Sequence, residues 1–204
     1  MPSLAEIWRA LHGAWRLALL DTRGLSDFDG SRSGGLRSFW AIAIVLPLDI
    51  AITAIDELGP TAEMLPPHNA AFQLLGSMLA WPLLLLVIYG LARWYGRAER
   101  YWLFVATYNW TQIPLALAVM LMVALFTAAG GLVDFSNLES ASGSPALFAY
   151  SAVLVAGAIW VVVHAYELYV AWLSLDAGIA LPIIVVLLDT VSNAALDKIS
   201  IWLG

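Results

Sequence analysis

Apolar residues fall into five long stretches that fill most of the chain. They cover residues 38–56, 70–92, 102–129, 146–173 and 178–200, separated by the connections 57–69, 93–101, 130–145 and 174–177. Each stretch is long enough to cross a hydrocarbon core about 30 Å thick at roughly 1.5 Å per helical residue. Because lipid offers the backbone no hydrogen-bond partners, such stretches are expected to be helices. The pattern predicts an all-α, polytopic membrane protein with a five-transmembrane-helix bundle at residues 38–204.

Residues 1–37 follow an amphipathic pattern instead. Between Ser3 and Leu20, one side of a predicted helix carries Leu4, Ile7, Trp8, Leu11, Trp15 and Ala18, and the other carries Glu6, Arg9, Gly13 and Arg16. Such a helix is expected to lie in the membrane interface, where the indoles of Trp8 and Trp15 sit at headgroup level. Arg9 and Arg16 would then meet anionic lipid. The same surface is a candidate docking face for a protein partner.

The arginines indicate the orientation of the chain. Five precede the first span and three fill the second connection, whereas the first and third connections have none: Arg9, Arg16, Arg23, Arg32 and Arg37, then Arg93, Arg97 and Arg100. Cytoplasmic loops carry an excess of arginine and lysine, so the N-terminus is predicted to be cytoplasmic. Five spans then place the C-terminus in the periplasm, although a re-entrant segment after Leu188 would reverse this. The compact connections favour a bacterial inner membrane.

Composition excludes a water-soluble domain and several kinds of chemistry. Hydrophobic residues make up 62% of the chain and charged residues 12%, far from the mix of a soluble protein. The absence of cysteine excludes disulfides and thiolate metal sites. The net charge of −6 indicates nothing about partners, since several acids lie inside apolar stretches. We expect the lipid bilayer, and no nucleic acid, as a partner.

Polar side chains inside the spans are the candidate functional residues. They are Asp49, Gln73, Asn109, Gln112, His164, Glu167, Asp189 and Asn193. Ionisable groups are costly within a membrane, so each is a functional-site hypothesis. His164 and Glu167 stand at i, i+3 and share a helical face. At the depth of Asp49 and Asp189 there is no lysine or arginine, so these acids are either neutral or bound to a cation.

Two interpretations of these residues compete. In the first, Asp49, His164, Glu167 and Asp189 form a relay or binding site for protons or a divalent metal. In the second, neutral acids and amides only link helices through hydrogen bonds of about 0.6 kcal/mol each. The second requires less, because one sequence cannot show that the polar faces of different helices meet.

The sequence carries no pattern typical of an enzyme. A glycine-rich phosphate loop after a strand, a Gly-x-Ser-x-Gly turn and paired zinc-binding histidines are all missing. We therefore expect a non-enzymatic protein without a cofactor. Small residues at Gly76, Ala80, Ala152 and Ala156 permit close helix packing. They are expected to serve contacts within the bundle, and a homo-oligomer stays an option.

Three short motifs add a resemblance to this architecture. They are Gly13-Ala14-Trp15-Arg16-Leu17, Asp21-Thr22-Arg23-Gly24-Leu25 and Tyr108-Asn109-Trp110. With a cytoplasmic N-terminal segment and five closely spaced spans, the chain resembles bacterial membrane proteins of the Yip1 type. The resemblance implies a non-enzymatic five-helix bundle. Eukaryotic relatives bind small GTPases and shape membranes in vesicle traffic, a pathway that bacteria lack.

The resemblance favours a scaffold or membrane-organising protein that acts through Trp8, Arg9, Trp15 and Arg16. The alternative is a small proton-coupled or cation permease that uses Asp49, His164, Glu167 and Asp189. Its weakness is a small size without inverted repeats. One observation separates the two functions: convergence of the four side chains on a single cavity favours transport, and scattered positions favour the scaffold.

Overall fold

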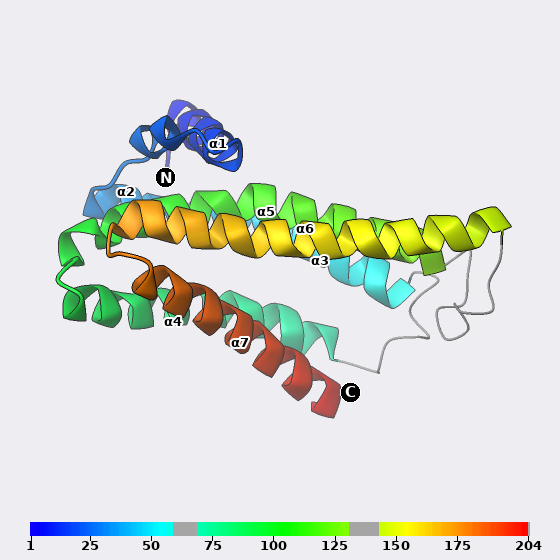
Figure 1. The fold of residues 1–204 in the computed structure, drawn as a ribbon. Helices are drawn as coiled ribbons and strands as arrows, with labels where there is room; N and C mark the ends of the chain where they lie inside the picture. Colours follow the sequence, from blue (N-terminus) through cyan, green and yellow to red (C-terminus); the bar gives the residue numbers. More distant parts are fainter. Residues whose placement is uncertain (59–68, 131–142, 204) are drawn as a thin grey trace.

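The computed structural model describes residues 1–58, 69–130 and 143–203, and these residues form helices and turns with no strand. Two short elements and two helices come first: α1 (Leu4–Ala18), η1 (Thr22–Asp27), α2 (Arg32–Ser38) and η2 (Phe39–Ala41). Long helices follow, namely α3 (Ile42–Leu58), α4 (Ala70–Trp94), α5 (Tyr101–Gly130), α6 (Gly143–Leu175) and α7 (Ala180–Leu203), with η4 (Ala98–Arg100) before α5 (Figure 1).

Five helical segments are long and apolar enough to cross a membrane, as predicted. They are Arg32–Ile55, Ala71–Trp94, Ala98–Gly130, Ala146–Leu175 and Ala180–Leu203. The first extends further toward the N-terminus than expected, because α2 and η2 lead directly into α3. The fifth is one continuous helix and does not turn back. Most of the predicted connections 57–69 and 130–145 lies outside the described residues.

The helix ends follow local capping chemistry. Ser3 and Glu6 form a reciprocal capping box at the start of α1, which satisfies two backbone groups that the first turn leaves free. Asn69 accepts a hydrogen bond from the Phe72 amide at the start of α4. At the end of α6, the guanidinium of Arg100 donates to the carbonyls of Ser174 and Leu173, both at 3.0 Å. A cation at a helix C-terminus is favourable there.

α5 and α6 also pack at the far end through Ala129, Ala149 and Ala152, but the larger buried core of the long helices lies at one end. We call this the arginine-rich end, because Arg32, Arg37, Arg93, Arg97 and Arg100 lie at the helix termini that meet there. At this end α4 and α7 pack against α5 and α6 through a fully buried core: Leu85, Ile88, Phe104, Val105, Leu175, Leu181 and Val185. Toward the opposite end, where the chain terminates, α7 leans away from α6 (Figure 1). The packing therefore leaves space at mid-depth.

Helix α1 packs against the rest of the chain through three small residues and Leu17. Ala10, Gly13, Ala14 and Leu17 are buried, and the Tyr166 hydroxyl of α6 donates to the Ala14 carbonyl at 2.9 Å. The predicted polar face is wrong at Gly13, which is buried against η1. A Cβ atom there would lie 2.9 Å from the Gly24 carbonyl oxygen and 2.8 Å from Asp27 Cβ. Glycine is required because the two backbones approach closely.

Candidate functional site

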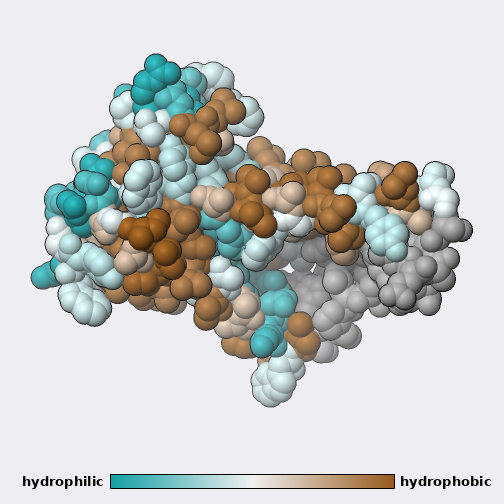
Figure 2. All heavy atoms as spheres, in the orientation of Figure 1, coloured by the Kyte–Doolittle hydropathy of each residue, from teal (hydrophilic) through white to brown (hydrophobic). Residues whose placement is uncertain are grey.

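A cavity of about 500 Å³ lies between the five long helices. Its polar lining comes from every one of them: Asp49 and Thr53 of α3, Gln73 and Ser77 of α4, Tyr108 and Gln112 of α5, His164 and Glu167 of α6, and Asp189, Thr190, Ser192 and Asn193 of α7. In Figure 2 the surface is hollowed between α6 and α7, while hydrophobic residues cover much of the outer surface around it. The polar interior therefore contrasts with an apolar exterior.

The cavity is lined by seven of the eight predicted intramembrane polar residues: Asp49, Gln73, Gln112, His164, Glu167, Asp189 and Asn193. The faces that a single sequence could not orient thus meet at one place. Asn109 is the exception, since it is buried beside the cavity and does not line it.

An acidic pair occupies the side of the cavity formed by α6 and α7. Asp189 accepts hydrogen bonds from the Tyr108 hydroxyl at 3.0 Å and from the Asn193 side-chain amide at 3.2 Å. Glu167 is close enough to Asp189 for the two carboxyl groups to interact electrostatically. One Glu167 oxygen, Oε2, is buried without a hydrogen-bond partner in the described part of the chain. The pair therefore has spare capacity to bind a proton or a donor.

His164 lies next to this pair but does not bond to Glu167, its predicted partner. Its Nδ1 lies 2.9 Å from the carbonyl oxygen of Trp160, one turn earlier in α6. A carbonyl only accepts, so Nδ1 carries a proton, and Nε2 is the acceptor whenever the ring is neutral. His164 also interacts electrostatically with Asp189. The imidazole therefore lines the same cavity as the acidic pair and is fixed by its own helix.

Asp49 faces the cavity from α3, without a hydrogen-bond or ion-pair partner for its carboxyl group among the described residues. No lysine or arginine of the described ranges lines the cavity. Within those ranges there is also no group of three or more His, Cys, Asp or Glu side chains placed to hold one metal ion. The cavity is acidic, but its acids are spread over several walls rather than gathered around one point.

Asn109 supports the cavity wall from behind. Its side-chain oxygen accepts a hydrogen bond from the Trp81 indole nitrogen at 2.9 Å, and its amide donates to the Ser38 hydroxyl at 2.8 Å. Asn109 is fully buried, so these bonds satisfy groups that would otherwise be costly. The residue ties α5 to α4 and to the end of α2, and it fixes the ring of Trp81.

Three aromatic side chains of the lining were not among the predicted site residues: Trp81, Tyr108 and Trp160. Helical spacing could have indicated two of them, because Tyr108 precedes Gln112 by one turn and Trp160 precedes His164 by one turn. The Trp160 and His164 rings stack with centroids 4.2 Å apart. Trp81 has no comparable signal, since its place in the wall depends on how α4 is rotated.

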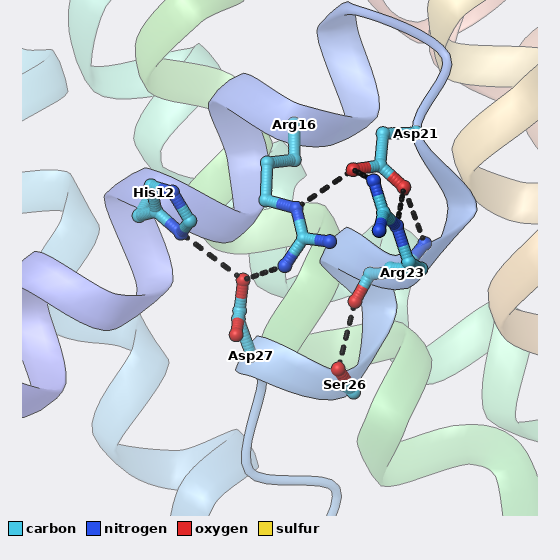
Figure 3. A network of polar contacts seen from close by, with 6 residues as sticks. All are labelled: His12, Arg16, Asp21, Arg23, Ser26 and Asp27. Carbon is cyan, nitrogen blue, oxygen red and sulfur yellow. Dashed lines mark hydrogen bonds and ion pairs between the residues drawn. The ribbon is translucent and has the colours of Figure 1, made fainter.

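The predicted lipid or partner contacts of α1 divide into two groups. Trp8 and Trp15 are 74% and 61% exposed, and Arg9 is exposed as well. Arg16 instead faces η1, where its guanidinium lies 2.9 Å from Asp21 and 3.3 Å from Asp27 (Figure 3). Hydrogen bonds from Arg23 and Arg16 hold the pKa of Asp21 well below its usual range. Arg16 therefore holds the N-terminal segment together.

Comparisons with models of known protein families, with curated proteins and with solved structures gave no match to this chain. The resemblance to the Yip1 type therefore stays a prediction.

Proposed function

We propose that the protein is a small proton-linked permease of a bacterial inner membrane. The observation that carries this proposal is the convergence of Asp49, His164, Glu167 and Asp189 on one cavity at the middle of the apolar helices. An ionisable group at that depth is costly unless it is paired or neutral. For an acid the cost is roughly 2.5–3.5 kcal/mol on insertion scales. Their retention in one place is typical of a path for protons or ions.

A purely structural role accounts for the cavity less well. Side chains that only link helices should have their hydrogen-bonding groups satisfied by neighbouring helices. Three lining residues instead keep a buried polar atom without a partner in the described ranges, namely Gln73 Oε1, Gln112 Nε2 and Glu167 Oε2. Each such atom costs about 1–3 kcal/mol. Groups maintained at this cost are better explained by a ligand that completes their hydrogen bonds.

The packing also suggests how access to the cavity would change. The helices are joined by a closely packed core at the arginine-rich end, and the cavity lies where that core stops. With the arginine-rich end in the cytoplasm, as the arginine distribution predicts, this conformation would be open away from the cytoplasm. Transport would then require α4 and α7 to close against α3 and α6 at the periplasmic side while their cytoplasmic contacts separate.

A second function, a Yip1-like membrane-organising role, is favoured by the exposed indoles of α1. Trp8 and Trp15 lie on the outer side of a helix whose small residues are buried, so both rings are free to enter a membrane interface. In this proposal α1 is an interfacial helix that binds lipid or a partner at the cytoplasmic surface. The two functions are compatible, because α1 and the cavity use different surfaces.

Proton flux into liposomes tests the permease directly. Full-length protein is reconstituted with an internal pH dye, and an imposed proton gradient is followed for the native chain, Glu167→Gln and Asp189→Asn. Each substitution is expected to reduce protein-dependent flux by about tenfold or more, because it removes a group that would bind the proton within the membrane. Asp197→Asn is the matched control, since Asp197 is exposed on α7 outside the cavity. Absence of flux from monodisperse, helical protein would contradict the proposal.

A further inference from the structure

Building on the proposed permease, we propose that its cargo is an organic cation, a protonated primary or secondary amine that carries an apolar body. The inference rests on three properties of the cavity: its charge, its fixed aromatic walls and its mixture of apolar surface with unpartnered polar atoms.

The charge of the lining selects a cation. Carboxyl groups come from three helices, with Asp49 on α3, Glu167 on α6 and Asp189 on α7, and no described lysine or arginine opposes them. The basic group nearest to the acidic pair is His164, whose Nδ1 is already bonded to the Trp160 carbonyl. An anion would find no fixed positive partner in this lining, whereas a cation would be stabilised by each carboxyl group that is ionised.

The aromatic walls favour an organic ammonium. Trp81, Tyr108 and Trp160 line the cavity, and each ring is held by its own contact. The Trp81 indole donates to Asn109, the Tyr108 hydroxyl donates to Asp189, and Trp160 stacks on His164. Aromatic faces attract cations by about 0.5–2 kcal/mol each, most strongly in desolvated sites. Rings that are already fixed lose little further conformational entropy when a ligand binds.

The size and the apolar part of the lining argue against a bare inorganic ion. About 500 Å³ falls within the roughly 300–1,000 Å³ of typical small-molecule sites. Several aliphatic side chains complete the walls, among them Val45, Ile52, Leu84, Leu115, Val119 and Met122. A divalent metal would instead require several oxygen or nitrogen ligands around one point, and the described residues provide no such group.

The unpartnered polar atoms favour an amine that still carries N–H groups. Glu167 Oε2 and Gln73 Oε1 are buried acceptors without a donor among the described residues, and rotation of these two lining side chains would present them to an ammonium in the cavity. A primary or secondary ammonium donates two or three hydrogen bonds, while a quaternary ammonium donates none. Charge-assisted hydrogen bonds of this kind are roughly twice as strong as neutral ones.

The test is equilibrium binding of radiolabelled phenethylamine to the full-length protein in lipid nanodiscs, with empty nanodiscs subtracted. At neutral pH this probe is a primary ammonium with one aromatic body. We expect saturable binding at one site per chain, displaced by unlabelled phenethylamine but not by equal concentrations of 2-phenylethanol or phenylacetate. Those competitors keep the body and replace the ammonium with a neutral or a negative group. Because the binding assay uses no proton gradient and measures no flux, it tests cargo recognition separately from transport.

Variants locate the site and control for folding. Glu167→Gln and Asp189→Asn are expected to weaken binding by about tenfold or more, because each removes a charge that the ammonium contacts. Asp197→Asn should bind like the native chain, and every variant is first shown to be monodisperse and helical. Trp160→Phe should retain more binding than Trp160→Leu, because phenylalanine keeps an aromatic face.

The outcomes separate the cargo from the permease. The amine proposal would be overturned if phenethylamine showed no saturable binding, or if 2-phenylethanol displaced it equally well. Proton flux in the same protein would still support the permease. Binding that the acid variants abolish, in a protein without proton flux, would support the amine site and overturn the transport function. Binding that the acid variants leave unchanged would place the probe outside this cavity and overturn the inference.

Discussion

Two polar clusters of this chain use the same kinds of residues in opposite ways. In the N-terminal segment, Asp21 lies between Arg16 and Arg23, and Asp27 contacts Arg16 and His12 (Figure 3). In the cavity, by contrast, Asp49, Glu167 and Asp189 line the walls with no described lysine or arginine among them. One cluster is complete by itself, and the other lacks the positive charge that would complete it.

The difference follows from the surroundings. Outside the apolar spans, water shares the cost of a charge, so ion pairs are weak and serve mainly to position the chain. Within the spans an acid without a cation is costly, so each such acid is a functional-site hypothesis. The N-terminal cluster should therefore respond to substitution with changes in structure, whereas the cavity should respond with changes in binding and transport.

The largest structural effect is expected from Gly24→Ala in the N-terminal segment. A Cβ atom at Gly24 would lie 2.6 Å from the Gly13 carbonyl oxygen, a backbone atom that cannot rotate away. Overpacking of this kind costs about 1–3 kcal/mol, and the docked state of α1 should lose that amount. Native-state hydrogen exchange of the α1 amides should accelerate accordingly, while phenethylamine binding in the cavity stays unchanged.

Gly157→Ala is the matched control for this substitution. A Cβ atom at Gly157 meets no heavy atom within 4 Å, so the exchange of α1 should not change. Alanine also has the higher helix propensity, so α6 should lose no stability. Unchanged hydrogen exchange of the α1 amides in Gly24→Ala would mean that the close approach of α1 to η1 is not maintained. The N-terminal segment would then lack the structural response to substitution that this comparison predicts.

A smaller loss is expected from Asn109→Ala, which tests a polar group that is buried among the spans but fully partnered. The substitution removes the acceptor of Trp81 and a bond to Ser38. Hydrogen bonds in membranes average about 0.6 kcal/mol, so two of them predict a loss of about 1 kcal/mol. Thermal unfolding in detergent measures it. Asn193→Ala is the control, because Asn193 is exposed and bonds only to Asp189 in the described ranges.

The contrast between these two asparagines also marks how far sequence reasoning reached. Hydropathy located the spans because lipid tolerates few alternatives to a long apolar helix. The polar residues within the spans were selected because placing such groups in a membrane costs free energy. Which of them meet depends on helix rotation and tilt, which no single span encodes. Asn109 was therefore grouped with the site residues although it supports Trp81. Gly13 was misplaced because its burial arises from backbone approach, which side-chain polarity does not reveal.

The next effect compares one substitution in both clusters. Asp27→Asn removes the charge that Arg16 and His12 contact at 3.3 Å, and such a pair is worth up to about 1 kcal/mol. Asp49→Asn removes an acid without a described partner, so it should cost no stability and can raise it. The melting temperature should therefore fall for Asp27→Asn and stay the same or rise for Asp49→Asn. A drop for Asp49→Asn equal to that for Asp27→Asn would show that Asp49 has a structural partner.

The smallest effect is expected from acid, and it should appear in the N-terminal segment first. Backbone hydrogen bonding from Ser3, with Arg37 nearby, lowers the pKa of Glu6, and hydrogen bonds from Arg23 and Arg16 lower the pKa of Asp21. A carboxyl group with a lowered pKa contributes stability above its unfolded value, near 4, and loses it as the pH falls through the folded value.

Docking of α1 should therefore stay constant from about pH 7.5 to about pH 5 and weaken only below about pH 4. Because the chain has no cysteine, spin labels at the exposed positions Ala5→Cys and Thr22→Cys can report the distance between α1 and η1 without background labelling. Asp21→Asn should broaden that distance already at neutral pH. Loosening between pH 7.5 and pH 5 would contradict this account, since carboxyl groups with a lowered pKa, such as Glu6 and Asp21, stay charged throughout that interval.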